Sequence, residues 1–312
     1  MSADRRHWAQ INEVSFVAGM KFLFLVFRWF GRWPFRFFLY PVVLFYVLRN
    51  PRARAASRGY LDRVLPGRAS TWLMVRHFIA FAEALLDKLR VWSGKLDVGQ
   101  VTRHNQQHFA EQQAQGRGGL IITGHLGNVE LCRALSKTRQ GLRLTILVHT
   151  KHAQAFNKLL AELNPESMLN LWQVTDMSPD VAIRLAEKVN AGEFVVIAGD
   201  RVPVSPNPRV AWADFLGQRA AFPVGPYVLA SLLQCPTYLL FCVQRDGGYH
   251  VYYELFREQI KLPRRERDAA FAELAADYAE RLAHYCRLAP LQWFNFYDFW
   301  APPQAVTHDA PN

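Results

Sequence analysis

Short apolar runs alternate with amphipathic stretches over residues 119–287, and this alternation restricts the fold of the 312-residue chain more than any other feature. The apolar runs are GLIIT at 119–123, LRLTILV at 142–148, LNLWQV at 169–174 and FVVIAG at 194–199. Apolar residues recur at helical spacing in the stretches between them, at 128–137, 153–163 and 180–190. Strands separated by helices of this length predict βαβ units, in which neighbouring strands run parallel.

The flanking sequence extends this pattern on both sides. A long amphipathic helix is expected over 72–92, and 104–119 is polar enough to be a linker. Further elements are expected downstream: a helix at 226–234, strands at 236–243 and 249–256, and a helix at about 266–287. We therefore predict an α/β fold with a mixed, centrally parallel sheet flanked by helices. Its expected organisation is an N-terminal segment 1–70, an α/β domain 71–300 and a flexible tail 301–312.

The N-terminal segment is aromatic and basic, and its apolar run from Val14 to Leu48 is interrupted by charges. Those charges are Lys21, Arg28, Arg32 and Arg36. The longest uncharged stretch is Phe37–Leu48, which is shorter than the roughly 20 residues that a membrane-spanning helix needs. On a helix the three arginines form one cationic stripe opposite Phe and Trp, and Gly31 and Pro34 would bend or split that helix. This pattern is typical of a segment that lies in the headgroup layer of a membrane.

The distribution of charge favours the same interpretation. Residues 1–120 hold 18 Lys+Arg and 7 Asp+Glu, so they carry the whole net charge of +11. Arginines next to an anionic leaflet contribute about 1 kcal/mol each. Unbroken Phe, Leu and Val between the arginines argue against nucleic-acid binding, which needs a phosphate-tracking surface. Two alternatives remain: a core hairpin with a solvated basic loop, and a tilted single span with snorkelling arginines.

Candidate catalytic residues follow the first strand, in GLIITGHLGNVELCRAL. Ligands of open α/β sheets bind beyond the carboxyl ends of the strands, which is where His125 falls. Glu130 is five residues on, about 140° around a regular helix, so the pair can meet only if His125 lies in a turn that the flanking glycines permit. A carboxylate on one imidazole nitrogen makes the other a general base. On spacing alone, a histidine near a glutamate is more often a satisfied structural pair than a catalytic one.

The segment GHLGNVE resembles the H-x-x-x-x-[DE] signature of the lysophospholipid acyltransferase superfamily, and most resembles its lipid A biosynthesis branch, with G-H-x-G-N-x-[DE]. FVVIAGDR (194–201), FLGQRAAFPVGP (215–226) and the aromatic N-terminus agree with that family, so the resemblance covers roughly residues 10–300. It implies the acyltransferase fold and direct attack of an acceptor hydroxyl on an acyl thioester. By resemblance His125 is the base and Glu130 orients it.

The substrate-binding residues expected beside this pair are Gly127, Asn128, Asp200, Arg201, Arg219, Phe222 and Gly225. Asn128 is a candidate N-cap, and the amides at that helix start could stabilise an oxyanion. Arg201, held by Asp200, and Arg219 are candidates for a phosphate on the acceptor or the carrier's arm, and surface arginines would look the same. The 215–226 block resembles the family's substrate-binding F-P-x-G block, in which glycerolipid enzymes carry an acidic residue where this chain has Val224. A glycerol-phosphate acceptor is therefore disfavoured.

The sequence as a whole predicts a membrane-bound O-acyltransferase at the cytoplasmic face of a bacterial inner membrane. The expected donor is an acyl thioester on acyl carrier protein or coenzyme A, and the acceptor is a lipid hydroxyl. No metal or cofactor is expected, because the thioester supplies the driving force. A metal site is also disfavoured, because the cysteines are far apart and no carboxylate cluster accompanies His149 and His152.

The aromatic run QWFNFYDFW at 292–300 is expected to be either a C-terminal plug or a wall for the acyl chain. Lipid A acyltransferases resemble this chain less there, because their matching tail is more basic. The sequence is similar in that respect to acyltransferases of bacterial pigment or aryl-polyene lipid clusters. Two other functions stay open: a thioesterase that uses the same pair with water, and a non-catalytic membrane-binding protein.

Overall fold

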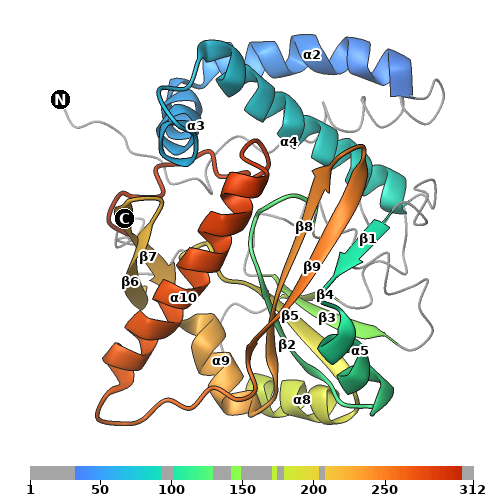
Figure 1. The fold of residues 1–312 in the computed structure, drawn as a ribbon, viewed down its shortest axis with the longest axis vertical. Helices are drawn as coiled ribbons and strands as arrows, with labels where there is room; N and C mark the ends of the chain where they lie inside the picture. Colours follow the sequence, from blue (N-terminus) through green and yellow to red (C-terminus); the bar gives the residue numbers. More distant parts are fainter. Residues whose placement is uncertain are drawn as a thin grey trace, which may run out of the picture.

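A computed structural model describes residues 32–92, 101–128, 142–148, 171–173, 179–203 and 208–303. Its centre is a seven-stranded sheet in the order β1-β9-β8-β2-β5-β3-β4 (Figure 1). The strands are β1 Val101–His104, β2 Gly119–Thr123, β3 Arg143–Val148, β4 Leu171–Gln173, β5 Glu193–Ala198, β8 Thr237–Arg245 and β9 Gly248–Arg257. Every neighbouring pair is parallel except the β8–β9 hairpin. The predicted mixed, centrally parallel sheet is therefore confirmed.

The middle of the sheet is its most buried part. Every residue of β2 is buried, as expected for a parallel strand that is covered on both faces. β2 pairs with β5 on one side and β8 on the other, so that Thr123 lies opposite Ala198. The residues that follow these two strands consequently meet at one edge of the sheet.

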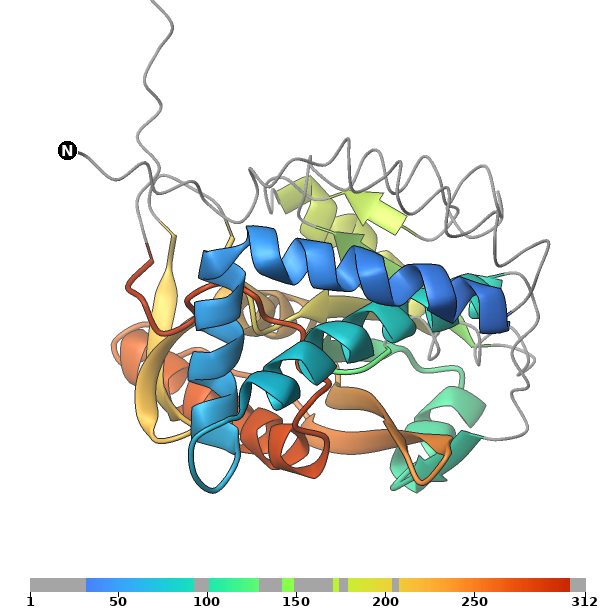
Figure 2. The same ribbon diagram turned by 90° about the horizontal axis from the view of Figure 1, so that it is seen from above.

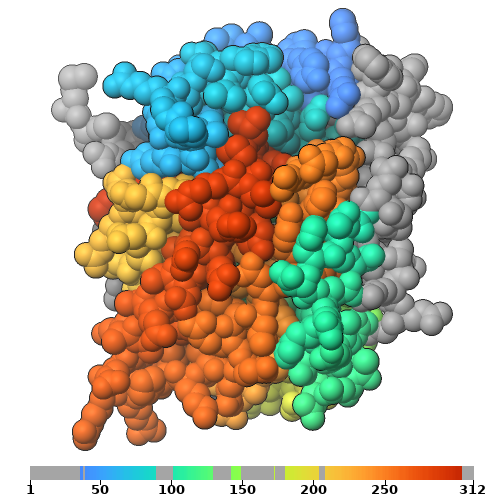
Figure 3. All heavy atoms as spheres, viewed as in Figure 1, coloured from blue at the N-terminus to red at the C-terminus, as the bar shows by residue number. Residues whose placement is uncertain are grey.

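Within the described ranges, five helices flank the sheet: α4 Thr71–Trp92, α5 Gln107–Ala114, α8 Pro179–Asn190, α9 Gly225–Leu233 and α10 Arg267–Leu288. Four of them lie where the periodicity predicted helices. The space-filling view shows α10 across the middle of one face, between α5 and the hairpin of β6 (Val210–Phe215) and β7 (Gln218–Pro223) (Figure 3). The predicted helices at 128–137 and 153–163 fall almost entirely outside the described residues.

The predicted linker 104–119 is wrong, because it contains α5 and the last residue of β1. One aromatic side chain explains the difference. Phe109 is buried and packs with ring centroids 4.4 Å from Phe194 and 5.2 Å from Tyr238. A single apolar anchor is too weak a pattern to reveal an amphipathic helix in a polar sequence.

A separate two-stranded sheet, β6 Val210–Phe215 and β7 Gln218–Pro223, precedes α9. Leu216 and Gly217 form its turn with φ of 52° and 81°, the left-handed pair that two-residue hairpins favour. Phe215 and Phe222 are buried on its inner face and pack against each other edge to face. The hairpin thus joins the aromatic core beneath the C-terminal segment.

Helices α2 (Arg32–Arg49) and α3 (Pro51–Val64) pack with α4 on the domain's main hydrophobic core, and α2 lies across α4 (Figure 2). Buried residues of α2 recur at helical spacing: Leu39, Val43 and Val47. Its outer face exposes Phe37, Tyr40, Val42, Leu44, Phe45 and Leu48. None of the helices within the described ranges is long and apolar enough to cross a membrane.

The predicted cationic stripe of the N-terminal helix does not include Arg36. Its guanidinium turns inward and donates to Glu83 of α4, with Nε 3.0 Å from Oε1. Arg36 therefore shares the face of the buried residues, and the exposed side chains described between Phe37 and Leu48 are apolar or aromatic. Arg28 lies outside the described residues, and Pro34 lies in the first turn of α2, where its missing N–H breaks no helical hydrogen bond.

A buried polar chain connects α3, α4 and the C-terminal segment. The Ser57 hydroxyl lies 2.9 Å from His77 Nδ1, and His77 Nε2 lies 3.0 Å from the carbonyl oxygen of Trp293. A carbonyl only accepts, so Nε2 carries the proton and Nδ1 accepts from Ser57. Burial lowers the pKa of His77 to about 4. The ring is therefore neutral at neutral pH, and its two hydrogen bonds fix α4 to the core.

We predict that His77 makes the free energy of unfolding decrease as the pH falls from about 7 to about 5. The pKa of His77 is about 4 in the folded protein against an unperturbed 6.5. Below that higher value the unfolded chain binds a proton that the folded chain does not, so acid stabilises the unfolded state. Each pKa unit corresponds to about 1.4 kcal/mol. Denaturant unfolding at the two pH values measures the loss.

His77→Gln is the matched variant, because glutamine keeps a donor and an acceptor and does not titrate. It should lose less stability on acidification than the wild type does. Equal losses in the two proteins would show that His77 is not responsible for the pH dependence.

Candidate active site

His125 lies just beyond the carboxyl end of β2, at the centre of the sheet. The last carbonyl of that strand, Thr123 O, accepts the Gly199 amide at 2.8 Å and the Tyr278 hydroxyl at 2.9 Å. Gly124 separates the strand from His125, and a Cβ there would lie 3.1 Å from both Asp200 Oδ2 and Tyr278 Oη. The chain therefore leaves β2 through a tightly packed turn, which fixes the position of the His125 backbone.

The backbone after His125 forms isolated bridges, Leu126 with Trp293 and Gly127 with Cys242. Its amides are used internally: Gly127 N donates to Gln292 O at 2.8 Å and Asn128 N to Cys242 O at 2.9 Å. Gly127 has φ of 66°, and a Cβ there would lie 1.8 Å from Cys242 O. Only glycine fits this position, as the glycine-permitted turn predicted. The predicted oxyanion role is not open to these two amides, because both already have acceptors.

The side chain that orients His125 is Asp200, which follows β5 on the neighbouring strand. Asp200 Oδ1 lies 2.8 Å from His125 Nδ1, and Oδ2 accepts the His125 backbone N–H at 2.6 Å. The indole Nε1 of Trp293 donates to the same Oδ2 at 3.0 Å. The Asp200 side chain is only 1% exposed. This is a buried carboxylate with three hydrogen-bond donors, which favour its charged form.

The electrostatics of the pair define which nitrogen is available. Burial alone would raise the pKa of Asp200, but His125 and Arg201 outweigh it and hold that pKa at about 2. The carboxylate is therefore charged at neutral pH, and Nδ1 of His125 carries the proton that it binds. Burial, and then the charge of Arg201, lower the pKa of His125 against the opposing effect of Asp200. A neutral imidazole with a basic Nε2 results.

The imidazole is also accessible, since 36% of the His125 side chain is exposed. A neutral imidazole with a fixed tautomer and a partly exposed ring is suited to remove a proton from a hydroxyl or from water. Within the described residues, no group of three His, Cys, Asp or Glu side chains gathers to hold a metal ion.

Glu130, the partner predicted for His125, lies outside the described residues. From the sequence we predicted that Asp200 holds Arg201, whereas in the structure the Asp200 oxygens accept hydrogen bonds from His125 and Trp293. The signal that could have identified this contact is the position of Asp200 at the end of a strand. Carboxyl ends of parallel strands share one edge of the sheet, but the sequence alone does not give the order of the strands.

The other predicted substrate residues are only partly brought together. Arg201 lies beside His125 and donates from Nη2 to the carbonyl of Phe294 at 3.0 Å. Arg219 is exposed on β7 with its guanidinium 5.7 Å from the Trp212 ring centroid. Phe222 is fully buried, and Gly225 is exposed at the start of α9. Among the described residues, no hydrogen bond, ion pair or ring contact joins these last three to His125, and their role in substrate binding stays a prediction.

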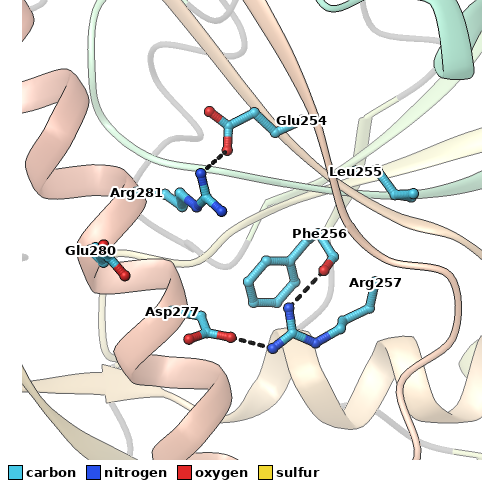
Figure 4. Close-up of a pocket in the computed structure, with 7 residues that line it drawn as sticks. All are labelled: Glu254, Leu255, Phe256, Arg257, Asp277, Glu280 and Arg281. Atoms are coloured by element: carbon cyan, nitrogen blue, oxygen red, sulfur yellow. Dashed lines mark hydrogen bonds and ion pairs between the residues drawn. The ribbon is translucent and has the colours of Figure 1, made fainter.

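Gly127 and Asn128 line a cavity of about 150 Å³ between α4 and the C-terminal segment. Its other lining residues are Ala80, Glu83, Ala84, Gln244, Tyr249, Leu291, Gln292 and Phe294. The Asn128 side chain is buried beside the Tyr249 hydroxyl. A second cavity, of about 110 Å³, lies between β9 and α10, where Arg257 pairs with Asp277 and Arg281 with Glu254 (Figure 4). The first cavity lies beside the turn at residues 124–127 that carries His125, the candidate catalytic turn, and it has both apolar and polar walls.

Comparison with known proteins identifies the family. The family model described as bacterial lipid A biosynthesis acyltransferase matches residues 46–301. The chain therefore belongs to the bacterial lipid A biosynthesis acyltransferase family and is an acyltransferase. A comparison with curated proteins finds no match. The matched region runs from α2 to the C-terminal aromatic segment and includes His125 and Asp200, so the predicted family branch is confirmed. The resemblance to pigment-cluster enzymes stays a prediction.

We predict that Asp200→Asn lowers turnover about 10²–10⁴-fold, the size of a general-base contribution. Asparagine cannot stabilise the imidazolium, and its amide can donate to Nδ1 and leave the proton on Nε2. Without the carboxylate the pKa of His125 falls further, so the acidic limb of the pH–rate profile moves to lower pH. Steady-state rates over a pH series measure both effects.

Asp277→Asn is the matched control, because Asp277 of α10 is ion-paired with Arg257 of β9. It should leave the rate within about twofold of wild type. A wild-type rate in Asp200→Asn would remove Asp200 from the mechanism.

Proposed function

We propose that this acyltransferase moves an acyl group from a thioester to a hydroxyl of a lipid acceptor, with His125 as general base. The observation that carries the proposal is the 2.8 Å contact between His125 Nδ1 and the buried Asp200 carboxylate. It leaves Nε2 basic and accessible at the carboxyl edge of the sheet. Membership of the lipid A family supports a lipid as the acceptor.

The chemistry needs one base and no covalent enzyme intermediate. Nε2 of His125 takes the proton of the acceptor hydroxyl while its oxygen attacks the thioester carbonyl carbon. The C–O bond forms, the C–S bond breaks, and the leaving thiolate receives the proton from the imidazolium. Asp200 stabilises the imidazolium during this cycle. Arg201, whose charge already acts on His125, is the described cation best placed to offset negative charge on the carbonyl oxygen.

Acyl carrier protein is our proposed donor, with coenzyme A as the alternative. Both present the thioester at the end of a pantetheine arm, which carries amides that need donors and acceptors. The cavity lined by Gly127 and Asn128 offers such a mixed wall next to the catalytic turn. A carrier docked with its arm along α4 would bring the thioester to Nε2.

The outer face of α2 supports contact with a membrane. Phe37, Phe45 and Leu48 are 73%, 66% and 65% exposed, and Trp72 at the start of α4 is 64% exposed. Large exposed apolar patches mark interaction sites, and this one is bordered by the basic Arg49 and Arg52. We propose that it rests in the headgroup layer on the cytoplasmic face of the inner membrane. There the enzyme would meet its lipid acceptor.

We predict that His125→Ala reduces acyl transfer about 10²–10⁴-fold, whereas Glu130→Gln leaves a residual rate. The first variant removes the base and the second an expected partner of it. The measurement is product formation by purified protein with an acyl-carrier thioester and a lipid acceptor. Acyl release that does not need the acceptor would instead identify a thioesterase.

His284→Ala is the control, because His284 is an exposed histidine of α10. It should transfer acyl groups at the wild-type rate. An undiminished rate in His125→Ala would overturn the proposed mechanism.

We predict that Phe45→Glu combined with Leu48→Glu weakens binding to vesicles of anionic phospholipid by tenfold or more. Burying one such side chain contributes about 1.5–3 kcal/mol, and a carboxylate also repels the anionic surface. Co-sedimentation with vesicles measures the change. The matched control is Ile183→Glu with Leu232→Glu, which alters two exposed apolar residues on α8 and α9. Equal weakening by both pairs would contradict docking through α2.

A further inference from the structure

Trp293 makes a contact that a merely space-filling aromatic residue would not need. Its side chain is completely buried, and its indole Nε1–H donates to Asp200 Oδ2 at 3.0 Å. The same oxygen accepts the His125 backbone amide, and the other oxygen binds His125 Nδ1. The indole therefore completes the set of donors around the carboxylate that orients the base.

We infer that Trp293 is a positioning residue for acyl transfer, which fixes the plane of the Asp200 carboxylate so that Oδ1 faces Nδ1 of His125. The inference rests on the proposed function for its effect on rate. It gives the C-terminal segment a role beyond the plug or acyl-chain wall expected from its composition. A plug needs only the ring, whereas this role needs the N–H.

The backbone around Trp293 is bound directly to the catalytic turn. Trp293 pairs with Leu126 in an antiparallel bridge, and the Phe294 amide donates to His125 O at 2.9 Å. On the far side of that bridge Gly127 donates to Gln292. These bonds hold the indole and the imidazole on two segments that are fixed to each other, so their relative orientation is set by main-chain geometry.

The opposite side of Trp293 is equally constrained. Its carbonyl accepts His77 Nε2–H at 3.0 Å. Its ring centroid lies 4.9 Å from that of Tyr60, 4.9 Å from that of Phe299 and 5.2 Å from that of Phe215. A ring that is enclosed by three others cannot turn, so the N–H points at Asp200 in one direction only.

A neutral donor is suited to this position. It stabilises the charged carboxylate without adding a charge that would compete with His125. Removing it would leave the negative charge of Asp200 less compensated by hydrogen bonds, which favours the imidazolium and raises the pKa of His125. Among the residues that the structure describes, the other charged or titratable groups that act on the pair are Arg201, Lys88, Tyr278, Tyr297 and Cys286. None of them is changed by a substitution at Trp293.

The test compares Trp293→Phe with Trp300→Phe. Trp300 is a matched control: its ring packs 5.9 Å from Phe215 in the same cluster, but its Nε1 donates to the carbonyl of Phe215 at 3.2 Å. We expect Trp293→Phe to lower kcat about tenfold or more with little change in KM, and to move the acidic limb of the pH–rate profile upward. Trp300→Phe should do neither. Equal effects of the two variants, or no effect of Trp293→Phe, would overturn the inference.

A second measurement needs neither turnover nor a stable Trp293 variant. In protein labelled with ¹⁵N at indole nitrogens, the Trp293 signal should shift as His125 titrates, and this response should vanish in His125→Ala and in Asp200→Asn. Indole signals that all ignore the titration would overturn the contact. Protein that shows the response but transfers no acyl group would refute the proposed function and leave the Trp293–Asp200 contact standing.

Discussion

The hydrogen bonds of the buried Asp200 carboxylate are the interaction on which the rest of the site depends. A charge that is 1% exposed is costly unless donors replace its water. Here the donors are the His125 backbone, the His125 ring and the Trp293 indole. They come from segments far apart in the sequence, so only the completed fold assembles them. His125, the proposed base, is thus oriented by the same contacts that make the buried charge tolerable.

The need of Asp200 for hydrogen-bond donors links the turn that carries His125 to the N-terminal helices. Trp293 binds Asp200 through its side chain and His77 through its carbonyl, and His77 in turn binds Ser57 of α3. The N-terminal helices, including α2 with its exposed apolar face, therefore rest on Trp293, which supports the His125–Asp200 pair. In the account proposed here, one packed unit holds the base at the sheet edge and places it close to the lipid that it modifies.

Periodicity predicted most of the sheet and four of its flanking helices, because strands such as β2 and helices such as α4 are long and regular in pattern. The position of His125 just after a central strand was also predicted from the sequence. The Asp200 contact was not, since β5 lies next to β2 only through a strand order in which β3 is displaced outward. His125 and Asp200 are 75 residues apart. Long-range contacts also explain α5, which depends on Phe109, and the inward turn of Arg36 toward Glu83.

The central claim is that the Asp200-bound imidazole of His125 drives acyl transfer to a lipid hydroxyl. Mass spectrometry of lipid extracts tests it most directly, with cells that make the wild-type protein compared with cells that make His125→Ala at an equal level. The account predicts a lipid species heavier by one acyl group in the wild-type extract alone, which would also identify acceptor and chain. The same species at equal abundance in both extracts would contradict it.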